Sequence, residues 1–180
     1  MIESWWYLGA WELLVAVWLP GALCTKSTAR SEPVVRRLGH TALMIAAAWL
    51  LFSPVRREPT TLLVFFVGAA LTWLGIAIAI WARFTLGSNW SGSVVVKRDH
   101  RLVIAGPYCA ARHPIYSGIL LAMLGTALGS GELRCLIAVP VAFVGLWIKS
   151  RHEEGFMREQ FGEDYVRYQA RVKAIVPGVF

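Results

Sequence analysis

One stretch of the chain restricts the possible folds more than any other feature. Residues 61–82 contain no Asp, Glu, Lys or Arg, and nearly all of their side chains are apolar. A helix needs roughly 20 apolar residues to cross about 30 Å of hydrocarbon, so this stretch predicts a membrane span. Four further stretches come close to that requirement, at residues 5–23, 38–52, 115–128 and 133–148. We therefore predict an all-α integral membrane protein with about five transmembrane helices.

The composition agrees with a membrane protein and excludes several other classes. Of 180 residues, 57% are hydrophobic and 16% are charged, and the mean hydropathy is +0.54. Soluble domains average about 45–50% apolar and about 25% charged residues, and disordered or collagen-like chains differ further. Three scattered cysteines, Cys24, Cys109 and Cys135, form no CxxC pair and are odd in number. We predict neither a bound metal nor a disulfide framework.

The first apolar stretch has two features that need interpretation. Glu3 is the only charge before it and no clear cleavage site follows, so we predict a retained span rather than a signal peptide. Glu12 lies inside the stretch, where a carboxylate is costly and often faces the interior of a helix bundle. Glu12 is close to the outer surface, however, and snorkelling or protonation there is the favoured interpretation.

The distribution of Lys and Arg predicts how the chain is oriented in the membrane. Of the 18 basic residues, all but three follow the first, third or fifth apolar stretch; the exceptions are Arg56, Arg57 and Arg134. Basic residues favour the cytoplasmic side, so we predict an external amino terminus and a cytoplasmic carboxyl terminus. The membrane would be the inner membrane of a prokaryotic cell or the endoplasmic reticulum of a eukaryotic one. Anionic lipid and topology explain the charges, so we predict no nucleic-acid partner.

Glycine and proline indicate how the last helices pack. Gly129-Ser130-Gly131-Glu132 predicts a tight turn, so the fourth and fifth stretches should form a helical hairpin. Gly125 and Gly129 form a GxxxG pair, for which we expect close helix packing within the chain rather than a dimer seam. Pro140 is expected to kink the fifth helix. We predict a monomer.

The segment before the fourth stretch combines polar residues with a helix start. Pro114 disfavours helix at His113 and is well tolerated in a first helical turn. Arg112 and His113 should therefore stand at the mouth of a helix, at the membrane surface. Free N–H groups and a partial positive charge there suit an anionic ligand group. A basic interfacial collar is an equally good interpretation of Arg112 and His113 taken alone.

The tail after the fifth stretch carries an acidic pair and an aromatic stripe. Glu153 and Glu154 are adjacent, so on a helix they point about 100° apart and at most one should easily face a site. Aromatic and apolar side chains then recur at helical spacing, at Phe161, Tyr165, Tyr168 and Val172. This stripe predicts an amphipathic helix on the bilayer, which is slightly favoured, or a lid over a cofactor, and the two are compatible.

Two patterns in these segments resemble the isoprenylcysteine carboxyl methyltransferase family, whose wider group includes phospholipid N-methyltransferases. The patterns are His100-x-Leu102-Val103-x-x-Gly106-x-Tyr108-x-x-x-Arg112-His113-Pro114-x-Tyr116-x-Gly118 and Glu153-Glu154 followed by Phe161-Gly162-x-x-Tyr165-x-x-Tyr168. The resemblance covers about the last 90 residues, and five spans resemble the short, prokaryote-type members. It divides the chain into transmembrane helices at 1–92 and a cofactor-binding catalytic half at 93–180.

The resemblance implies that S-adenosylmethionine is bound on the cytoplasmic side and released as S-adenosylhomocysteine. The lipophilic methyl acceptor would enter from the bilayer. Lys149 aligns with the family's substrate-contacting arginine, and Arg151 follows it, but lysine cannot grip a carboxylate in the bidentate way. Ser93 aligns with a further polar cofactor contact. The implied cofactor contacts are His100, Arg101, Leu102, Val103, Tyr108, His113, Pro114, Ile115, Tyr116 and Glu153.

The chemistry of these residues agrees with that assignment. Arg112 and His113 can meet the carboxylate of S-adenosylmethionine, and Glu153 can pair with its ammonium or accept from ribose hydroxyls. An acceptor carboxylate is ionised at neutral pH and needs no base, whereas an amine would need one from His113 or the glutamates. The predicted catalytic residues are Arg112, Glu153 and Glu154, with no metal.

These observations predict an S-adenosylmethionine-dependent methyltransferase that acts on a lipid or lipid-modified acceptor at the cytoplasmic membrane face. The carboxylate of a prenylcysteine-like substrate is the favoured acceptor. The alternatives are a phospholipid amine N-methyltransferase, an NADPH-dependent membrane reductase that shares the cofactor-binding end, and a carrier or scaffold without turnover.

Overall fold

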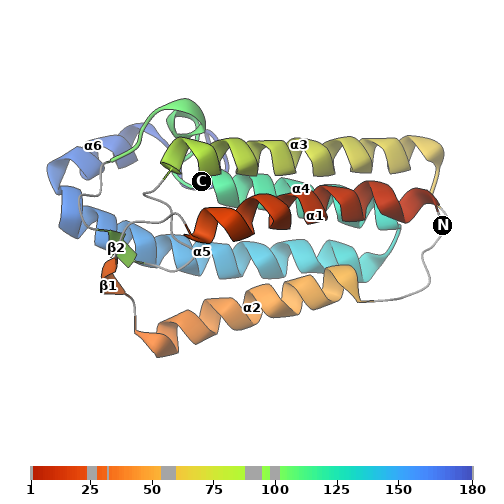
Figure 1. Ribbon diagram of the computed structural model, residues 1–180, viewed down its shortest axis with the longest axis horizontal. Coiled ribbons are helices and arrows are strands. Elements are labelled where there is room, and N and C mark those ends of the chain that lie inside the picture. Colours follow the sequence, from red (N-terminus) through yellow and green to blue (C-terminus); the bar gives the residue numbers. More distant parts are fainter. Residues whose placement is uncertain are drawn as a thin grey trace.

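Five long helices make up most of the computed structural model, which describes residues 2–23, 28–31, 33–53, 60–87, 95–97 and 102–179. Figure 1 shows the helices lying side by side along the long axis of the molecule. Each of the five predicted apolar stretches is confirmed as helical. The helices are α1 (Ile2–Leu23), α2 (Val34–Phe52), α3 (Leu62–Leu86), α4 (Pro114–Ser130) and α5 (Leu133–Phe161).

The length and hydropathy of these helices confirm an all-α integral membrane protein. Three helices, α2, α3 and α5, are long and apolar enough to cross a membrane. The apolar part of α1 (Trp6–Leu19) and α4 are shorter, so the count of five spans stays a prediction. The described residues add one small ribbon, in which β1 (Thr28–Ser31) pairs antiparallel with β2 (Val95–Lys97).

Glycines allow α3 and α4 to pack with their backbones in contact. A Cβ atom built on Gly68 would lie 2.6 Å from the carbonyl oxygen of Gly125, and one on Gly125 would lie 2.5 Å from that of Gly68. A Cβ atom on Gly129 would overlap the hydroxyl of Tyr7 on α1. Small residues permit such close approach between membrane helices. The predicted packing of Gly125 and Gly129 within the chain is confirmed.

Hydrogen bonds reinforce this glycine contact inside the apolar bundle. The Thr72 hydroxyl of α3 donates to the Gly68 carbonyl at 2.9 Å and lies 3.2 Å from the Thr126 hydroxyl of α4. The Trp11 indole of α1 donates to Thr126 at 3.1 Å. These side chains satisfy one another where no water is at hand, as polar groups in an apolar bundle must.

Helices α4 and α5 form the predicted hairpin. Helix α4 ends at Ser130, and Gly131 takes the left-handed conformation (φ 72°) that commonly ends a helix. Helix α5 begins at Leu133 and contains Pro140. It packs along α2 through small side chains, and the Arg134 guanidinium donates to the Ser53 carbonyl at 2.6 Å.

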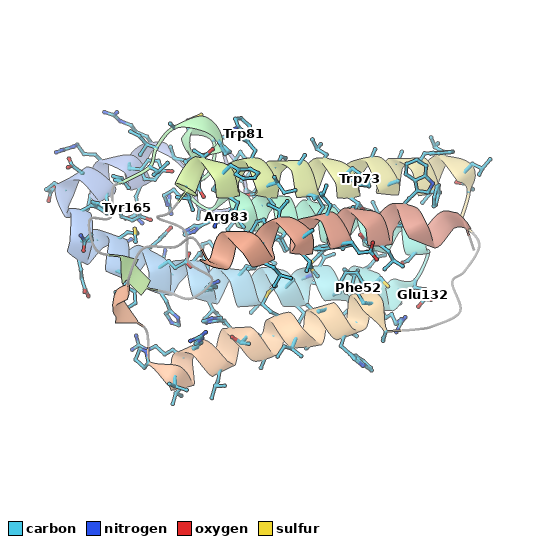
Figure 2. All side chains as sticks on the ribbon, in the orientation of Figure 1. Phe52, Trp73, Trp81, Arg83, Glu132 and Tyr165 are labelled. Carbon is cyan, nitrogen blue, oxygen red and sulfur yellow. The ribbon has the colours of Figure 1, made fainter. Side chains whose placement is uncertain are left out.

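The two polar segments lie at the same end of the bundle. Figure 1 shows the short helix α6 (Glu163–Arg171), the 3₁₀ helix η2 (Gly106–Cys109) and the start of α4 at one end. The hairpin turn and the start of α3 lie at the other end. In Figure 2, Tyr165 and Arg83 mark the first end, and Phe52 and Glu132 mark the second. The polar segments can therefore build one site.

The glycine contact between α3 and α4 can be tested with one added methyl group. We expect Gly125→Ala to destabilise the protein by about 1–3 kcal/mol, because the new Cβ atom meets backbone that has no room to move. Gly9→Ala on α1 is the matched control, since a Cβ there meets nothing within 4 Å. Thermal unfolding in detergent measures both variants. Equal midpoints for the two would contradict the close contact.

Candidate functional site

Glu154 is the most deeply buried acidic residue among those described. Helix α5 continues beyond its apolar part to Phe161 and carries this residue into the protein, where 1% of its surface is exposed. The Arg112 guanidinium donates to Glu154 Oε1 from Nε at 2.9 Å and from Nη2 at 2.6 Å. The Gln169 amide donates to Glu154 Oε2 at 2.9 Å. Both carboxylate oxygens are thus satisfied.

His113 links Glu154 to its neighbour. Its Nε2 lies 3.4 Å from Glu154 Oε1, and its Nδ1 lies 3.4 Å from Glu153 Oε2. The prediction that at most one glutamate would face the site is wrong. The two carboxylates do leave the helix in different directions, but one imidazole lies between them and offers a nitrogen to each.

Tyr116 completes the cluster one turn into α4. Its hydroxyl donates to Glu153 Oε1 at 2.7 Å, and its ring stacks on His113 with centroids 5.2 Å apart and an interplanar angle of 3°. Lys149 Nζ lies 5.5 Å from the centroid of the same ring. We call Arg112, His113, Tyr116, Glu153 and Glu154 the polar cluster.

The chain after α6 pairs with the segment that leads into α4. The backbone N–H groups of Arg112 and His113 donate to the Lys173 and Ala174 carbonyls, both at 2.8 Å. The Ser117 hydroxyl donates to the carbonyl of Ile175. This pairing places Arg112 and His113 beside the glutamates of α5.

Helix α6 packs on the protein through its aromatic face. Tyr165 and Tyr168 are buried, at 3% and 9% exposure, and the Tyr168 hydroxyl donates to the Tyr108 carbonyl at 2.6 Å. The favoured interpretation of this face as a bilayer-contacting surface is therefore wrong. Burial raises the pKa of Tyr168 to about 12, so its hydroxyl keeps its proton and remains a donor.

Arg112 holds α6 as well as Glu154. Its Nη1 donates to the carbonyls of Val172 and, at 3.4 Å, of Gln169, which lie at the carboxyl end of α6. A guanidinium there also interacts favourably with the helix dipole. In this structure Arg112 is a positioning residue, and its predicted contact with a ligand carboxylate stays a prediction.

The structure brings several predicted cofactor residues together. Val103, Tyr108, Ile115 and Tyr116 join one apolar cluster with Leu146 of α5. Pro114 opens α4, and Arg151 Nη1 lies 3.7 Å from Glu154 Oε2. Whether these residues bind a cofactor or acceptor stays a prediction. Ser93, His100 and Arg101 lie outside the described residues.

The contacts of Gln169 and of the tail carbonyls that bind Arg112 were not predicted from the sequence. Gln169 follows the aromatic stripe but belongs to no sequence motif, and a backbone carbonyl has no signature in a sequence. Only the spacing of the stripe, which predicts a helix able to pack inward, hinted at contacts here.

The electrostatics of the polar cluster favour a charged His113. Burial disfavours the imidazolium, but hydrogen bonds to Glu153 and Glu154 and the charges of both carboxylates outweigh burial and raise the pKa of His113. Two cations, Arg112 and His113, then face two carboxylates. The cluster is balanced in charge and largely shielded from water.

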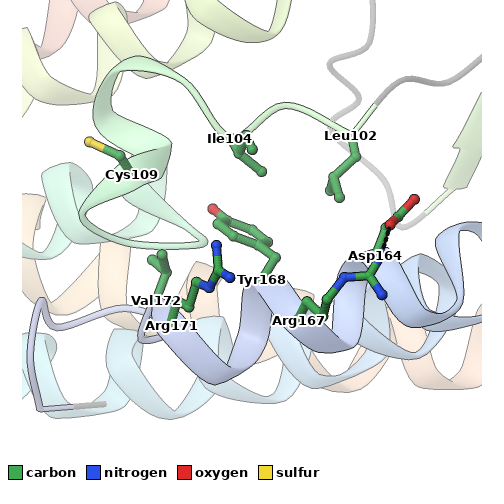
Figure 3. Close-up of a pocket in the computed structure, with 8 residues that line it drawn as sticks. All are labelled: Leu102, Ile104, Cys109, Asp164, Arg167, Tyr168, Arg171 and Val172. Carbon is green, nitrogen blue, oxygen red and sulfur yellow. Dashed lines mark hydrogen bonds and ion pairs between the residues drawn. The ribbon is translucent and has the colours of Figure 1, made fainter.

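A cavity of about 460 Å³ lies beside the polar cluster, between residues 102–109 and α6 (Figure 3). Of the predicted site residues that the structure describes, only Leu102 lines it. The described lining residues are Leu102, Ile104, Cys109, Asp164, Arg167, Tyr168, Arg171 and Val172.

Much of the chain is similar to a known protein family. The family model described as phospholipid methyltransferase matches residues 63–164, which is more than half of the chain and includes the whole polar cluster. The chain belongs to the phospholipid methyltransferase family. Its matched region runs from α3 into the first turn of α6, so the tail that pairs with Arg112 lies beyond it.

Three curated relatives of this phospholipid methyltransferase family member share the printed name protein-S-isoprenylcysteine O-methyltransferase. It is 32% identical over 62% of its length to protein-S-isoprenylcysteine O-methyltransferase B of Arabidopsis thaliana, covering 58% of that protein. It is 32% identical over 62% of its length to the Saccharomyces cerevisiae enzyme, covering 48% of it. It is 30% identical over 71% of its length to the Homo sapiens enzyme, covering 45%. The chain thus spans about half the length of the curated relatives it matches.

The ion pair between Arg112 and Glu154 can be tested by a double substitution. We expect Arg112→Ala to lower the free energy of unfolding by about 3–5 kcal/mol, because it leaves a buried carboxylate without its strongest partner. Adding Glu154→Gln should recover part of that loss, since the unpaired charge is then gone. Thermal unfolding in detergent measures both.

The exposed pair of Arg167 and Asp164, whose side chains are 63% and 70% exposed, provides the control. We expect Arg167→Ala to change stability by less than about 1 kcal/mol. A double variant no more stable than Arg112→Ala would show that the buried charge is not what makes Arg112 important.

The raised pKa of His113 predicts a pH dependence of stability. The folded pKa lies above the unfolded value of about 6.5, so His113 contributes fully below that pH and loses its contribution as pH rises through the folded pKa. We expect the stability advantage of the natural protein over His113→Gln to shrink as the pH rises above about 6.5 and through the raised pKa of the folded protein. Thermal unfolding at a series of pH values measures it. A constant difference would mean that the imidazolium is not stabilised by the glutamates.

Proposed function

We propose that this protein is an S-adenosylmethionine-dependent methyltransferase that modifies a lipid or lipid-modified acceptor. The observation that carries the proposal is the polar cluster, which joins residues of α4 and α5 in the region that the family model matches. The printed names of the relatives support methyl transfer to a prenylcysteine carboxylate as the reaction.

The residues of the cluster suit the methyl donor in two respects. The Glu153 side chain is 20% exposed and uses one oxygen each for Tyr116 and His113. A carboxylate has about four acceptor positions, so Glu153 can still accept from an ammonium or a ribose hydroxyl. The stacked rings of His113 and Tyr116 and the apolar cluster around Tyr108 offer a surface for adenine.

When bound, S-adenosylmethionine would supply a methyl group on a positively charged sulfur. The residues of this chain would orient it and exclude water. Lys149 lies over Tyr116, where its ammonium can attract an acceptor carboxylate to the same end of the bundle. An acceptor placed close to the methyl group gains rate from proximity, without a covalent intermediate on the protein.

The protonation of the cluster favours a carboxylate acceptor. An amine must lose a proton to a base before it can attack. The pKa of His113 is raised, which favours the imidazolium, and both oxygens of Glu154 accept hydrogen bonds. Neither His113 nor Glu154 is therefore well suited to act as the base for an amine. The name of the family model keeps a phospholipid amine as the second candidate.

The cytoplasmic face of the membrane is the proposed location. Fifteen of the 18 lysines and arginines follow the first, third or fifth helix, and the polar cluster lies at the end where those helices finish. By the positive-inside rule, this distribution supports a site in the cytoplasm and an amino terminus outside.

One substitution and one product analysis test the proposal. We expect Glu153→Gln to weaken S-adenosylmethionine binding at least tenfold, about 1.4 kcal/mol, because a neutral amide cannot pair with an ammonium. Isothermal titration calorimetry measures the affinity in detergent. Glu163→Gln, an exposed acid on α6, should leave it unchanged.

The product analysis supplies labelled S-adenosylmethionine and a lipid extract that contains prenylcysteine. A methyl ester releases volatile label in alkali, whereas an N-methyl group keeps it. We expect alkali-labile label with the natural protein and little with Glu153→Gln. Alkali-stable label would favour the phospholipid amine, and no labelled product would remove the methyltransferase proposal.

A further inference from the structure

The cavity between residues 102–109 and α6 has two kinds of wall. Figure 3 shows Leu102 and Ile104 on one side, facing Tyr168 and the arginines of α6 on the other. Its volume of about 460 Å³ falls within the range of about 300–1,000 Å³ that is typical of small-ligand sites. Apart from Leu102, the described residues that line it lie outside the set considered for the methyl donor.

The polar wall is suited to an anion. Arg167 and Arg171 are four residues apart on α6, so they lie one above the other on the same side of the helix. Arg167 pairs with Asp164, but both side chains are well exposed and such pairs are weak. No acidic residue within the described part of the chain forms an ion pair with Arg171. Two guanidinium groups can therefore hold one phosphate in their fork geometry.

The apolar wall lies close to exposed aromatic side chains of α3. Ile104 is 55% exposed, and Gly106, two residues on, lies against α3, where an added Cβ would be 3.7 Å from the Trp81 ring. Trp81 and Phe84 are themselves 57% and 68% exposed on α3, and Figure 2 shows Trp81 beside the η2 segment. Tryptophan is enriched at the boundary between headgroups and acyl chains. The cavity thus has apolar and basic walls at that boundary.

We propose that this cavity binds the headgroup of an anionic phospholipid. Arg167 and Arg171 would hold the phosphate, while Leu102, Ile104 and Val172 would contact the glycerol and the first part of an acyl chain. A soluble phosphate ester shares the anionic group, but it would leave the exposed Ile104 and its apolar neighbours without a partner. The proposal does not rest on methyl transfer.

Binding there has a structural consequence for the polar cluster. Helix α6 is held to the segment 102–109 by the hydrogen bond from Tyr168 to the Tyr108 carbonyl. The Val172 carbonyl, next to the cavity, accepts from Arg112, which binds Glu154. A lipid that bridges the two walls would stabilise these contacts, so anionic lipid should raise the unfolding temperature.

Lipid retention in native mass spectrometry tests the proposal. Detergent-purified protein is titrated with phosphatidylglycerol and with phosphatidylcholine, and the bound fraction of each is measured. We expect Arg171→Gln to lower retention of phosphatidylglycerol about fivefold relative to phosphatidylcholine, as a lysine or arginine near anionic lipid contributes about 1 kcal/mol. Arg36→Gln, an exposed arginine on α2 with the same change of charge, should have little effect.

Further outcomes separate the proposal from its competitors. Ile104→Ser should reduce retention of both lipids with the charges intact, and it provides a second variant if Arg171→Gln fails to fold. Equal losses for Arg36→Gln and Arg171→Gln would show a general charge effect and overturn the proposal. Stabilisation by glycerol phosphate equal to that by phosphatidylglycerol would assign the cavity to a soluble phosphate and overturn it too.

Measuring the affinity for S-adenosylmethionine on the same variants distinguishes this proposal from the proposed function. We expect Arg171→Gln to bind S-adenosylmethionine like the natural protein. Weaker binding of S-adenosylmethionine with unchanged lipid retention would make the cavity part of the cofactor site and overturn the lipid proposal. If Arg171→Gln loses lipid retention and the natural protein binds no S-adenosylmethionine, the result would support the lipid site and count against methyl transfer.

Discussion

The buried carboxylate of Glu154 determines how the polar end of this molecule is assembled. An ionised group with 1% of its surface exposed needs partners for both oxygens, because burial without them costs several kcal/mol. Those partners come from two places: Arg112 and His113 before α4, and Gln169 in α6. The extension of α5, the mouth of α4 and the short helix α6 must therefore all meet at one point.

This interaction gives specificity more than net stability. A buried ion pair commonly contributes little compared with apolar residues of the same size, whereas an arrangement that leaves one charge unpaired is strongly disfavoured. Alternative placements of α6 would separate Glu154 from Gln169 and Arg112 from the carbonyls of the last turn. The polar cluster thus fixes the position of α6, and with it the pairing of the tail against the start of α4.

The sequence predicts the helices well because a membrane leaves few alternatives. Residues 61–82 could hardly be anything but a helix, and Gly131 ends α4 where the turn pattern placed it. The charge distribution predicted that the two polar segments share one end, as the bundle shows. The residues that carry the resemblance also include Tyr116 and Glu153, and the structure shows a hydrogen bond between these two side chains.

Prediction from the sequence failed where a contact depends on the distance between two side chains rather than on the direction in which each leaves its helix. Helical periodicity separates Glu153 from Glu154 by direction, yet it cannot show that one imidazole is placed to reach both. The stripe of Tyr165 and Tyr168 was compatible with lipid or with protein, and only the position of Tyr108 decides which. The predicted contacts of His100 and Arg101 lie outside the described residues.

The glycine contact between α3 and α4 makes these two helices a rigid part of the bundle. With backbone against backbone at Gly68 and Gly125, no layer of side chains can rotate to let these two helices slide. They form a stationary pair, onto which α1 is fastened through Trp11. Any movement that lets a lipid tail pass must therefore take place at a contact between other helices of the bundle.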